Sequence, residues 1–228
     1  MSLRGLVRRL LGVRDGAHAD AALRDLAFVA IDLETTGLDP RRDDPVALAA
    51  IPFVGGQPDV DAGYTRLVNP GRPISSASQA IHGIGDDDVR DAPSVAAALA
   101  EFLAVCRGRP LVAHTADFDL AIVNRNARAA GLPSHTGPVL DIGLMAHALF
   151  PAWWDLSLEG LARLVEIEPI DRHTATGDAL TAGLIFTAMV PPLERRGVRT
   201  VGAALRSQRS GRLVPEGPGA TGGGLSGP

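Results

Sequence analysis

Cysteine is almost missing from this sequence, and lysine is missing altogether. The single cysteine, Cys106, excludes a disulfide framework within the chain and any zinc site built from several cysteines. This scarcity favours a reducing compartment, so we expect a cytoplasmic protein. All 22 basic residues are arginines. We interpret this as coding bias, although arginine also suits bidentate contacts to phosphate.

Long apolar runs and a strong net charge are also absent. No stretch has the length of apolar sequence needed to cross a membrane, and Arg8 and Arg9 interrupt any signal-peptide core near the start. The formal net charge of -4 does not mark the whole chain as a nucleic-acid binder. Acidic residues gathered at a metal site would hide such a function, because bound divalent ions reverse the local field.

Composition divides the 228 residues into three parts. Residues 1–25 begin with a stretch, residues 1–14, in which Leu and Val alternate with Arg. They predict a basic amphipathic segment, which is either a surface that binds membranes or partners or a solvated terminus. Residues 26–200 carry the hydrophobic patterns of one domain of ordinary size. Residues 201–228 are assigned to a tail rich in Gly and Pro, which we expect to be disordered.

Short apolar segments and longer periodic ones predict an α/β fold. The five predicted strands are residues 26–32, 45–56, 62–71, 109–114 and 137–141. The predicted helices include residues 94–108, 117–131, 157–167 and 177–190. Three strands in succession, followed by strands that alternate with helices, indicate a mixed five-stranded sheet flanked by helices.

Two carboxylates stand at the end of the first predicted strand, in "FVAIDLETTGL". Asp32 and Glu34 lie two residues apart, so on a continuing strand both side chains leave the same face. Like charges this close raise one pKa unless a cation bridges them. A hard divalent metal such as Mg²⁺ or Mn²⁺ would keep both ionised. A solvated strand end is the alternative for so common a pair.

Two later segments offer partners for this pair. Asp119 follows a predicted strand and could lie at the same sheet edge as Asp32, or could merely favour a helix N-terminus, as Asp117 could. His173 and Asp178 stand before an apolar helix, where they could be a surface histidine and a capping residue. Together, four carboxylates and a histidine have the composition of a two-metal phosphodiester hydrolase, with the histidine as general base.

The segments "FVAIDLETTGL", "LVAHTADFDLAIV" and "HTATGDA" resemble, in this order, the three motifs of the DnaQ-like 3′–5′ exonucleases of the DEDDh subclass. That family includes the proofreading epsilon subunit of bacterial DNA polymerase III. The resemblance implies a ribonuclease H-like fold and two divalent ions, Mg²⁺ or Mn²⁺. It also implies release of nucleoside monophosphates from a single-stranded 3′ end. By position, the metal ligands would be Asp32, Glu34, Asp119 and Asp178, and the general base would be His173.

The same resemblance implies which residues receive the 3′-terminal nucleotide. These are Thr35, Thr36, Gly37 and Leu38, which follow the Asp-x-Glu pair, and His82 in "SQAIHGIGDDDV". Leu38 could instead anchor its loop in the core. His114 is expected to shape its own loop by hydrogen bonding. Trp153 and Trp154 form either a base-stacking platform or part of a packed loop.

The substrate class stays open at this level, because no motif reports a 2′-hydroxyl. We expect DNA, in a proofreading or repair role, with an RNA-trimming or small-oligonucleotide exonuclease as the alternative. A catalytically silent nucleic-acid-binding module is the alternative from another class, although such a module would not need all four acids and His173. A polymerase or another enzyme could be the partner, and the sequence does not indicate an oligomeric state.

Overall fold

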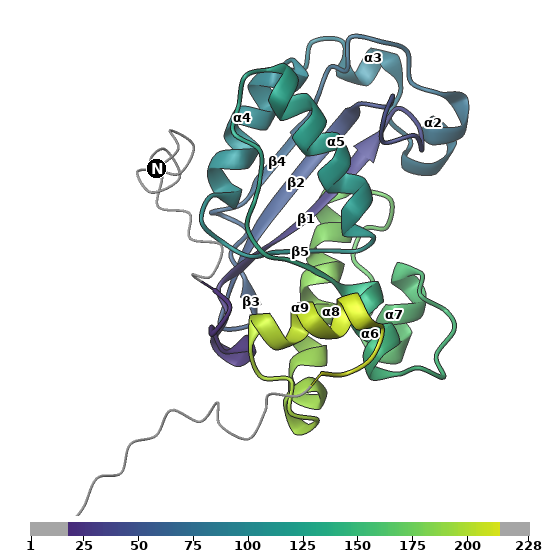
Figure 1. Cartoon of the computed structure of the whole chain (residues 1–228). Coiled ribbons are helices and arrows are strands. Elements are labelled where there is room, and N and C mark those ends of the chain that lie inside the picture. The colour runs from purple at the N-terminus through teal and green to yellow at the C-terminus, as the bar shows by residue number, and fades with distance from the viewer. Residues whose placement is uncertain (1–17, 215–228) are drawn as a thin grey trace, which may run out of the picture.

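The structure is a computed structural model that describes residues 18–214 (Figure 1). Most of the expected basic N-terminal segment and residues 215–228 of the expected tail therefore lie outside the described residues. The fold begins before the predicted boundary at residue 26. A 3₁₀ turn covers Leu23–Asp25, the Leu23 side chain is buried, and Ala22 forms a bridge to Thr200. These few residues are therefore tied to the domain.

One mixed sheet forms the centre of the part that the structure describes. Its six strands are β1 (Phe28–Thr35), β2 (Pro45–Val54), β3 (Gln57–Pro58), β4 (Tyr64–Leu67), β5 (Leu111–Ala113) and β6 (Val139–Asp141). The order is β3-β2-β1-β5-β6, with β4 also paired to β2. β1 runs antiparallel to β2 and parallel to β5, and β5 runs parallel to β6. All five predicted strands are present. The prediction missed β3, which has only two residues and pairs with β2 across a Gly-Gly turn.

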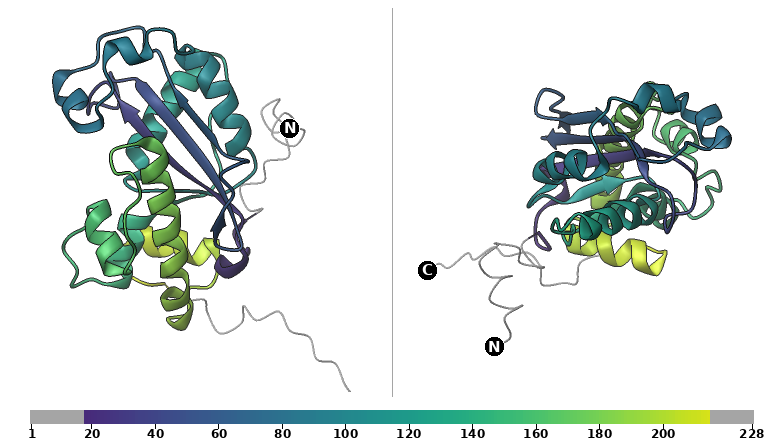
Figure 2. Two further views of the ribbon diagram at one scale, coloured as in Figure 1. Left: turned by 180° about the vertical axis from the view of Figure 1, so that it is seen from behind. Right: turned by 90° about the horizontal axis from the view of Figure 1, so that it is seen from above.

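The two faces of the sheet are covered by different helices, because alternate residues of a strand point to opposite sides. Val29, Ile31 and Leu33 pack with α4 (Val95–Cys106) and α5 (Ala116–Ala129). Phe28 and Ala30 pack on the other face, which is covered by α6 (Ile142–Leu149), α7 (Leu158–Leu164), α8 (Ala175–Arg195) and α9 (Val201–Ser210). The rear view shows α8 across this second face (Figure 2). Along β1, Asp32 and Glu34 follow Phe28 and Ala30 at every second residue, so their side chains point to this second face.

The prediction of a disordered tail from residue 201 is wrong for its first ten residues, which form α9. Thr200 caps this helix by accepting a hydrogen bond from the Ala203 amide at 3.3 Å. Val201, Ala203 and Ala204 are fully buried in the core beside α6. The Gly- and Pro-rich composition begins only after α9, so it does not extend back to the predicted tail boundary at residue 201.

Two short helices precede α4 and were not predicted, because neither is long enough to show a hydrophobic period. They are α2 (Ser76–His82), capped by Ser75, and α3 (Asp86–Val89). The acidic run Asp86 to Asp88 forms the first turn of α3. Across residues 18–214, the structure contains no helix with the length and apolar character of a membrane span.

Candidate metal centre

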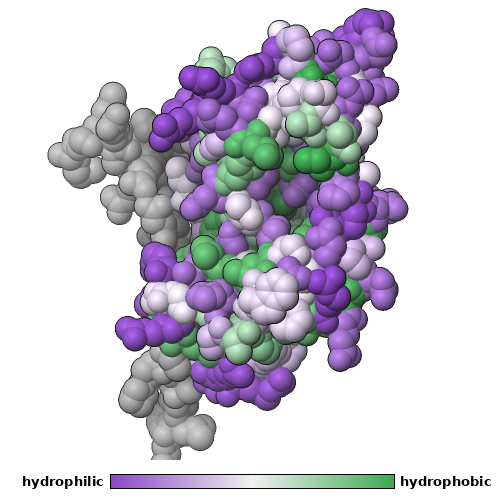
Figure 3. All heavy atoms as spheres, turned by 90° about the vertical axis from the view of Figure 1, so that its right-hand side faces the viewer, coloured by the Kyte–Doolittle hydropathy of each residue, from purple (hydrophilic) through white to green (hydrophobic). Residues whose placement is uncertain are grey.

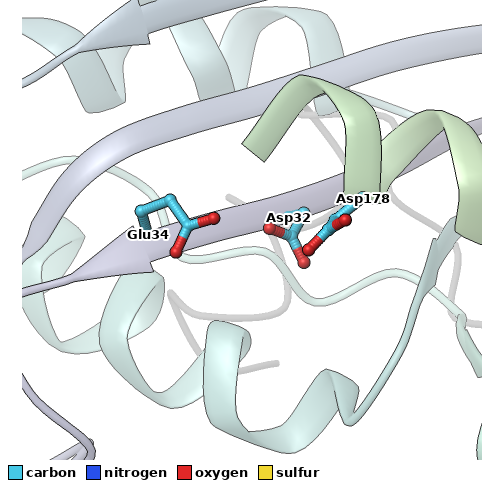
Figure 4. Close-up of side chains that lie close together, drawn as sticks. All are labelled: Asp32, Glu34 and Asp178. Carbon is cyan, nitrogen blue, oxygen red and sulfur yellow. The ribbon is translucent and has the colours of Figure 1, made fainter. Parts of the chain in front are cut away.

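Three carboxylates meet where β1 passes the beginning of α8. Asp32, Glu34 and Asp178 each offer an oxygen, and these three oxygens all lie within 4.8 Å of one another. Figure 4 shows the Asp32 and Asp178 carboxylates beside each other, with Glu34 further along the strand. Two of the segments that the sequence singled out therefore converge on one point.

The start of α8 is held so that Asp178 faces the strand. Thr174 caps the helix by accepting a hydrogen bond from the Gly177 amide at 3.1 Å. A side chain at Gly177 would overlap the carbonyl oxygens of Ile170 and Asp171. Glycine therefore lets the first turn of α8 lie against the preceding loop, and this contact fixes where Asp178 points.

Asp119 reaches the same edge of the sheet from the opposite side. It lies in the first turn of α5, is only 4% exposed, and accepts a backbone hydrogen bond from Leu33, between the two acids of β1. The beginning of α5 is anchored because Asp141 accepts a hydrogen bond from the Ala116 amide at 2.9 Å. Asp119 is not one of the three acids within 4.8 Å of one another, but its charge acts directly on Asp32.

Burial and mutual repulsion make these acids hard to ionise together. Burial is the main reason that the pKa of Asp32 lies well above its ordinary value, and the charges of Asp119, Asp178 and Glu34 add to it. Burial, with a smaller contribution from Asp178, raises the pKa of Glu34 to about 7. Burial also raises the pKa of Asp119. A cation among these oxygens would remove the repulsion, and carboxylate oxygens are the ligands that Mg²⁺ and Mn²⁺ prefer.

One positive charge of the chain itself lies at the cluster, and the sequence analysis missed it. The guanidinium of Arg172 pairs with Asp178 and, on its other side, lies 2.7 Å from Glu159 of α7. The positive charge of Arg172 opposes the rise in the pKa of Asp32 and of Glu34. Arg172 directly precedes His173, but no local pattern in the sequence links it to Glu159. This partnership exists only in three dimensions.

The proposed general base lies outside the group of three acids. His173 is exposed on the loop before α8, with a positive φ of 62°. Its charge acts on Glu159 of α7 and is one of the causes that lower the pKa of that carboxyl. Asp117, the alternative to Asp119, is exposed in the first turn of α5. Asp117 therefore matches the simple helix-end role.

The segment after β1 is a tight turn whose polar side chains bond within it. The Thr35 hydroxyl donates to the Gly37 carbonyl at 2.7 Å, and the Thr36 hydroxyl donates to Asp43 at 2.9 Å. A side chain at Gly37 would overlap the Asp43 carboxylate. Arg125 of α5 holds the far side of this turn by donating to the Pro40 carbonyl at 2.8 Å. The turn is thus fixed relative to both β1 and α5.

Leu38 and His82 stand next to this turn. Leu38 is 78% exposed, so the alternative that it anchors its loop in the core is wrong. His82 Nδ1 accepts a hydrogen bond from the Ile84 amide at 3.0 Å, which leaves Nε2 to donate to the Thr35 carbonyl at 3.2 Å. Burial lowers the pKa of His82. His82 therefore ties the end of α2 to the end of β1, beside the acids.

Comparison with known proteins places this geometry in a family. The exonuclease family RNase_T matches residues 29–186, a span that contains all four acids and His173. The DNA polymerase III subunit epsilon-like protein of Rhodobacter capsulatus is 40% identical over 204 residues, which are 88% of this chain and 29% of that protein. A PolC-type DNA polymerase III of Streptococcus sanguinis is 34% identical over 182 residues, 79% of this chain and 12% of that protein. The chain thus spans under a third of these relatives.

Solved structures agree on the fold. Exonuclease I of E. coli in complex with a dT13 oligonucleotide superposes with a TM-score of 0.65 at 18% identity, over 75% of this chain and 42% of that one. Exonuclease X in complex with 5′ overhanging duplex DNA superposes with a TM-score of 0.60 at 23% identity, over 79% of this chain and 99% of that one. These structures support the predicted ribonuclease H-like architecture, and the sequence match supplies the family. The chain belongs to the RNase_T exonuclease family.

Proposed function

We propose that this chain is a metal-dependent 3′–5′ exonuclease that releases nucleoside monophosphates from single-stranded 3′ ends, with DNA as its substrate. The observation that carries the proposal is that Asp32, Glu34 and Asp178 meet at one edge of the sheet. The charge of Asp119 acts on Asp32 in this group. The family match and the relatives among bacterial DNA polymerases III support the reaction class and the choice of DNA.

The residues at this edge fit a pair of hard divalent ions. They offer carboxylate oxygens at close range, and burial with mutual repulsion raises the pKa of three of the acids, Asp32, Glu34 and Asp119. Asp32, Glu34, Asp119 and Asp178 would hold two Mg²⁺ or Mn²⁺ ions. Such ions supply a clamp for the scissile phosphate and an activated water.

His173 is proposed as the general base. It lies on the loop that leads directly into Asp178, and an imidazole can accept a proton from water near neutral pH. The pairing of Arg172 with both Glu159 and Asp178 ties this loop to α7 and α8. His173 is exposed, so the proposed role requires its side chain to turn toward a substrate held at the acids.

The turn after β1 is proposed to receive the terminal nucleotide. Thr35, Thr36 and Gly37 form its backbone, Leu38 is exposed above it, and His82 is bonded to it. The exposed Leu38 side chain offers an apolar surface on which the terminal base could pack while its phosphate lies at the acids. The hydroxyls of Thr35 and Thr36 already bond within the turn, so their contribution would be to its shape.

A polymerase partner and a cytoplasmic location also belong to this proposal. One relative is named a DNA polymerase III subunit epsilon-like protein and another a PolC-type DNA polymerase III, which suggests work beside a polymerase. The one cysteine is free and buried, which fits a reducing compartment.

The test uses matched 5′-labelled single strands of DNA and RNA, with Mg²⁺, with Mn²⁺ and with EDTA. We expect a ladder that shortens from the 3′ end, faster on DNA, and stops in EDTA. Asp119→Ala should abolish it, whereas the control Asp117→Ala, on the same helical turn but exposed, should leave it unchanged. Faster shortening of RNA would replace the proposed substrate with the RNA alternative. Failure to shorten either strand, with the protein folded, would favour the silent binding module.

A further inference from the structure

Two neighbouring tryptophans in the loop between α6 and α7 have different surroundings. Trp153 is partly buried, and its indole N–H donates to the Asp155 carbonyl at 2.7 Å. Trp154 is 88% exposed, more than any other large hydrophobic side chain in the described part of the chain. The sequence left a base-stacking platform and a packed loop as alternatives. The structure gives the packed role to Trp153 and leaves the indole of Trp154 free.

The loop that presents Trp154 is anchored to α7 through the next residue, Asp155. The Asp155 carboxylate accepts a hydrogen bond from the Ser157 hydroxyl at 2.6 Å and pairs with Arg163 of α7. A side chain at Gly160 would overlap Asp155, so glycine allows the loop to fold against α7. A large aromatic surface on an anchored backbone loses little conformational freedom when it binds a partner.

This loop lies on the same face of the sheet as Asp32. β1 and β5 run parallel and pair at Ala30 and Val112, and Asp32 and His114 each stand two residues further along their own segment, toward the same edge of the sheet. The ring Nε2 of His114 bonds to the Leu156 carbonyl at 2.7 Å. One hydrogen bond therefore links the loop to the segment that leaves β5 at the sheet edge where Asp32 lies.

A series of ion pairs also connects α7, which follows the loop, to the acids. Glu159, in the first turn of that helix, pairs with Arg172, and Arg172 pairs with Asp178. The turn after β1 and the helix α2 carry two further exposed apolar side chains, Leu38 at 78% and Ile81 at 52% exposed. Seen from the side toward which α2 and α7 project, the surface is hollowed between an upper and a lower part, with hydrophobic residues along the hollow (Figure 3).

We propose that Trp154 is a stacking platform for an unpaired nucleobase of the strand whose 3′ end lies at the acids. This inference rests on the proposed exonuclease function. Every base has an apolar face, so an exposed indole binds single strands without regard to sequence. The loop is linked to the sheet edge of Asp32 through His114 and Leu156, so Trp154 would meet a base upstream of the terminal nucleotide. The site therefore favours strands longer than a dinucleotide.

The first test measures binding of 5′-labelled single-stranded DNA by fluorescence anisotropy in Ca²⁺, with strand integrity checked on a gel. We expect Trp154→Ala to bind an oligonucleotide about tenfold more weakly than the wild type, since one stacked base contributes roughly that factor or more. Trp154→Phe keeps a ring and should restore most of the affinity. Dinucleotide binding should not change. The control Val54→Ala alters an exposed side chain at the far end of the sheet and should bind normally.

The second test combines the variant with a strand that carries one abasic position, scanned upstream of the 3′ end. At one position, the missing base should weaken binding to the wild type as much as Trp154→Ala weakens binding of the intact strand. The same abasic strand should bind the variant no more weakly than the intact strand does. Two results would overturn the stacking role and leave the exonuclease proposal in place. One is that the abasic position and Trp154→Ala lower the binding free energy additively at every position. The other is that wild type and Trp154→Ala bind the intact strand equally. Absence of both binding and shortening of any strand by the wild type would overturn both.

Discussion

Replacing Glu34 by glutamine should make the metal-free protein more stable above neutral pH. Burial, assisted by the charge of Asp178, raises the pKa of Glu34 from 4.5 to about 7. A carboxyl whose pKa is higher in the folded state than in the unfolded state favours unfolding once it ionises. Glutamine keeps the shape of the side chain but carries no charge.

The size of the effect follows from the pKa. One pKa unit corresponds to about 1.4 kcal/mol, so the rise from 4.5 to about 7 corresponds to about 3 kcal/mol. Below pH 4.5 the carboxyl is protonated in both states and the penalty is absent. Between 4.5 and about 7 only the unfolded chain releases the proton, so the free energy of unfolding falls as pH rises. Above about 7 the whole penalty is present.

Urea unfolding in EDTA measures this difference. Wild type and Glu34→Gln should unfold alike below pH 4.5, and the variant should be more stable by about 3 kcal/mol above pH 7. Excess Mn²⁺ should reverse the order, because only the wild type keeps all its ligands and gains stability by binding. The exposed control Asp117→Asn should follow the wild type. A Glu34→Gln variant no more stable than the wild type above pH 7 would refute the reasoning.

Three further substitutions test how neighbouring contacts hold the site. In each case, a variant whose measured quantity equals that of the wild type would contradict the role given to the contact. Gly177→Ala should lower the free energy of unfolding by roughly 1–3 kcal/mol in a thermal melt, because the new methyl group overlaps backbone carbonyls. Arg125→Ala should raise KM more than it lowers kcat in steady-state kinetics, because it removes the contacts to Pro40 and Asp44 that hold the turn after β1 but leaves the four acids of the site in place. Glu159→Gln should raise the metal concentration that gives half-maximal rate, because Arg172 then competes more strongly for Asp178.

The sequence predicted the longer apolar elements and missed elements that are short or rich in small and polar residues. β1, β2 and β5 are apolar runs with buried faces, and α8 is a long apolar helix, so their patterns indicate their structure directly. β3 has two residues and exists only because a Gly-Gly turn returns the chain to β2. The short helix α9 carries small and polar residues, and its helical state depends on packing against α6.

The sequence singled out the four acids because each stands near an element end, within a segment that resembles a motif of the DnaQ-like exonucleases. The sequence also placed His114 in a shaping role, and its bond to Leu156 is consistent with that. Arg172 could not be predicted, because its partners Glu159 and Asp178 lie on separate helices and meet only after folding. The exposure of Leu38 likewise depends on how the turn after β1 is anchored, which local sequence does not report.

The most direct test of the central claim is the release of a 3′-terminal label from single-stranded DNA in Mn²⁺. The acids at the edge of β1 and α8 are predicted to make the wild type release the label as a mononucleotide. The double variant Asp32→Ala, Glu34→Ala, which removes two of the three clustered acids, should release none. Release at the same rate by wild type and double variant, or release of the label only within longer fragments, would contradict the account.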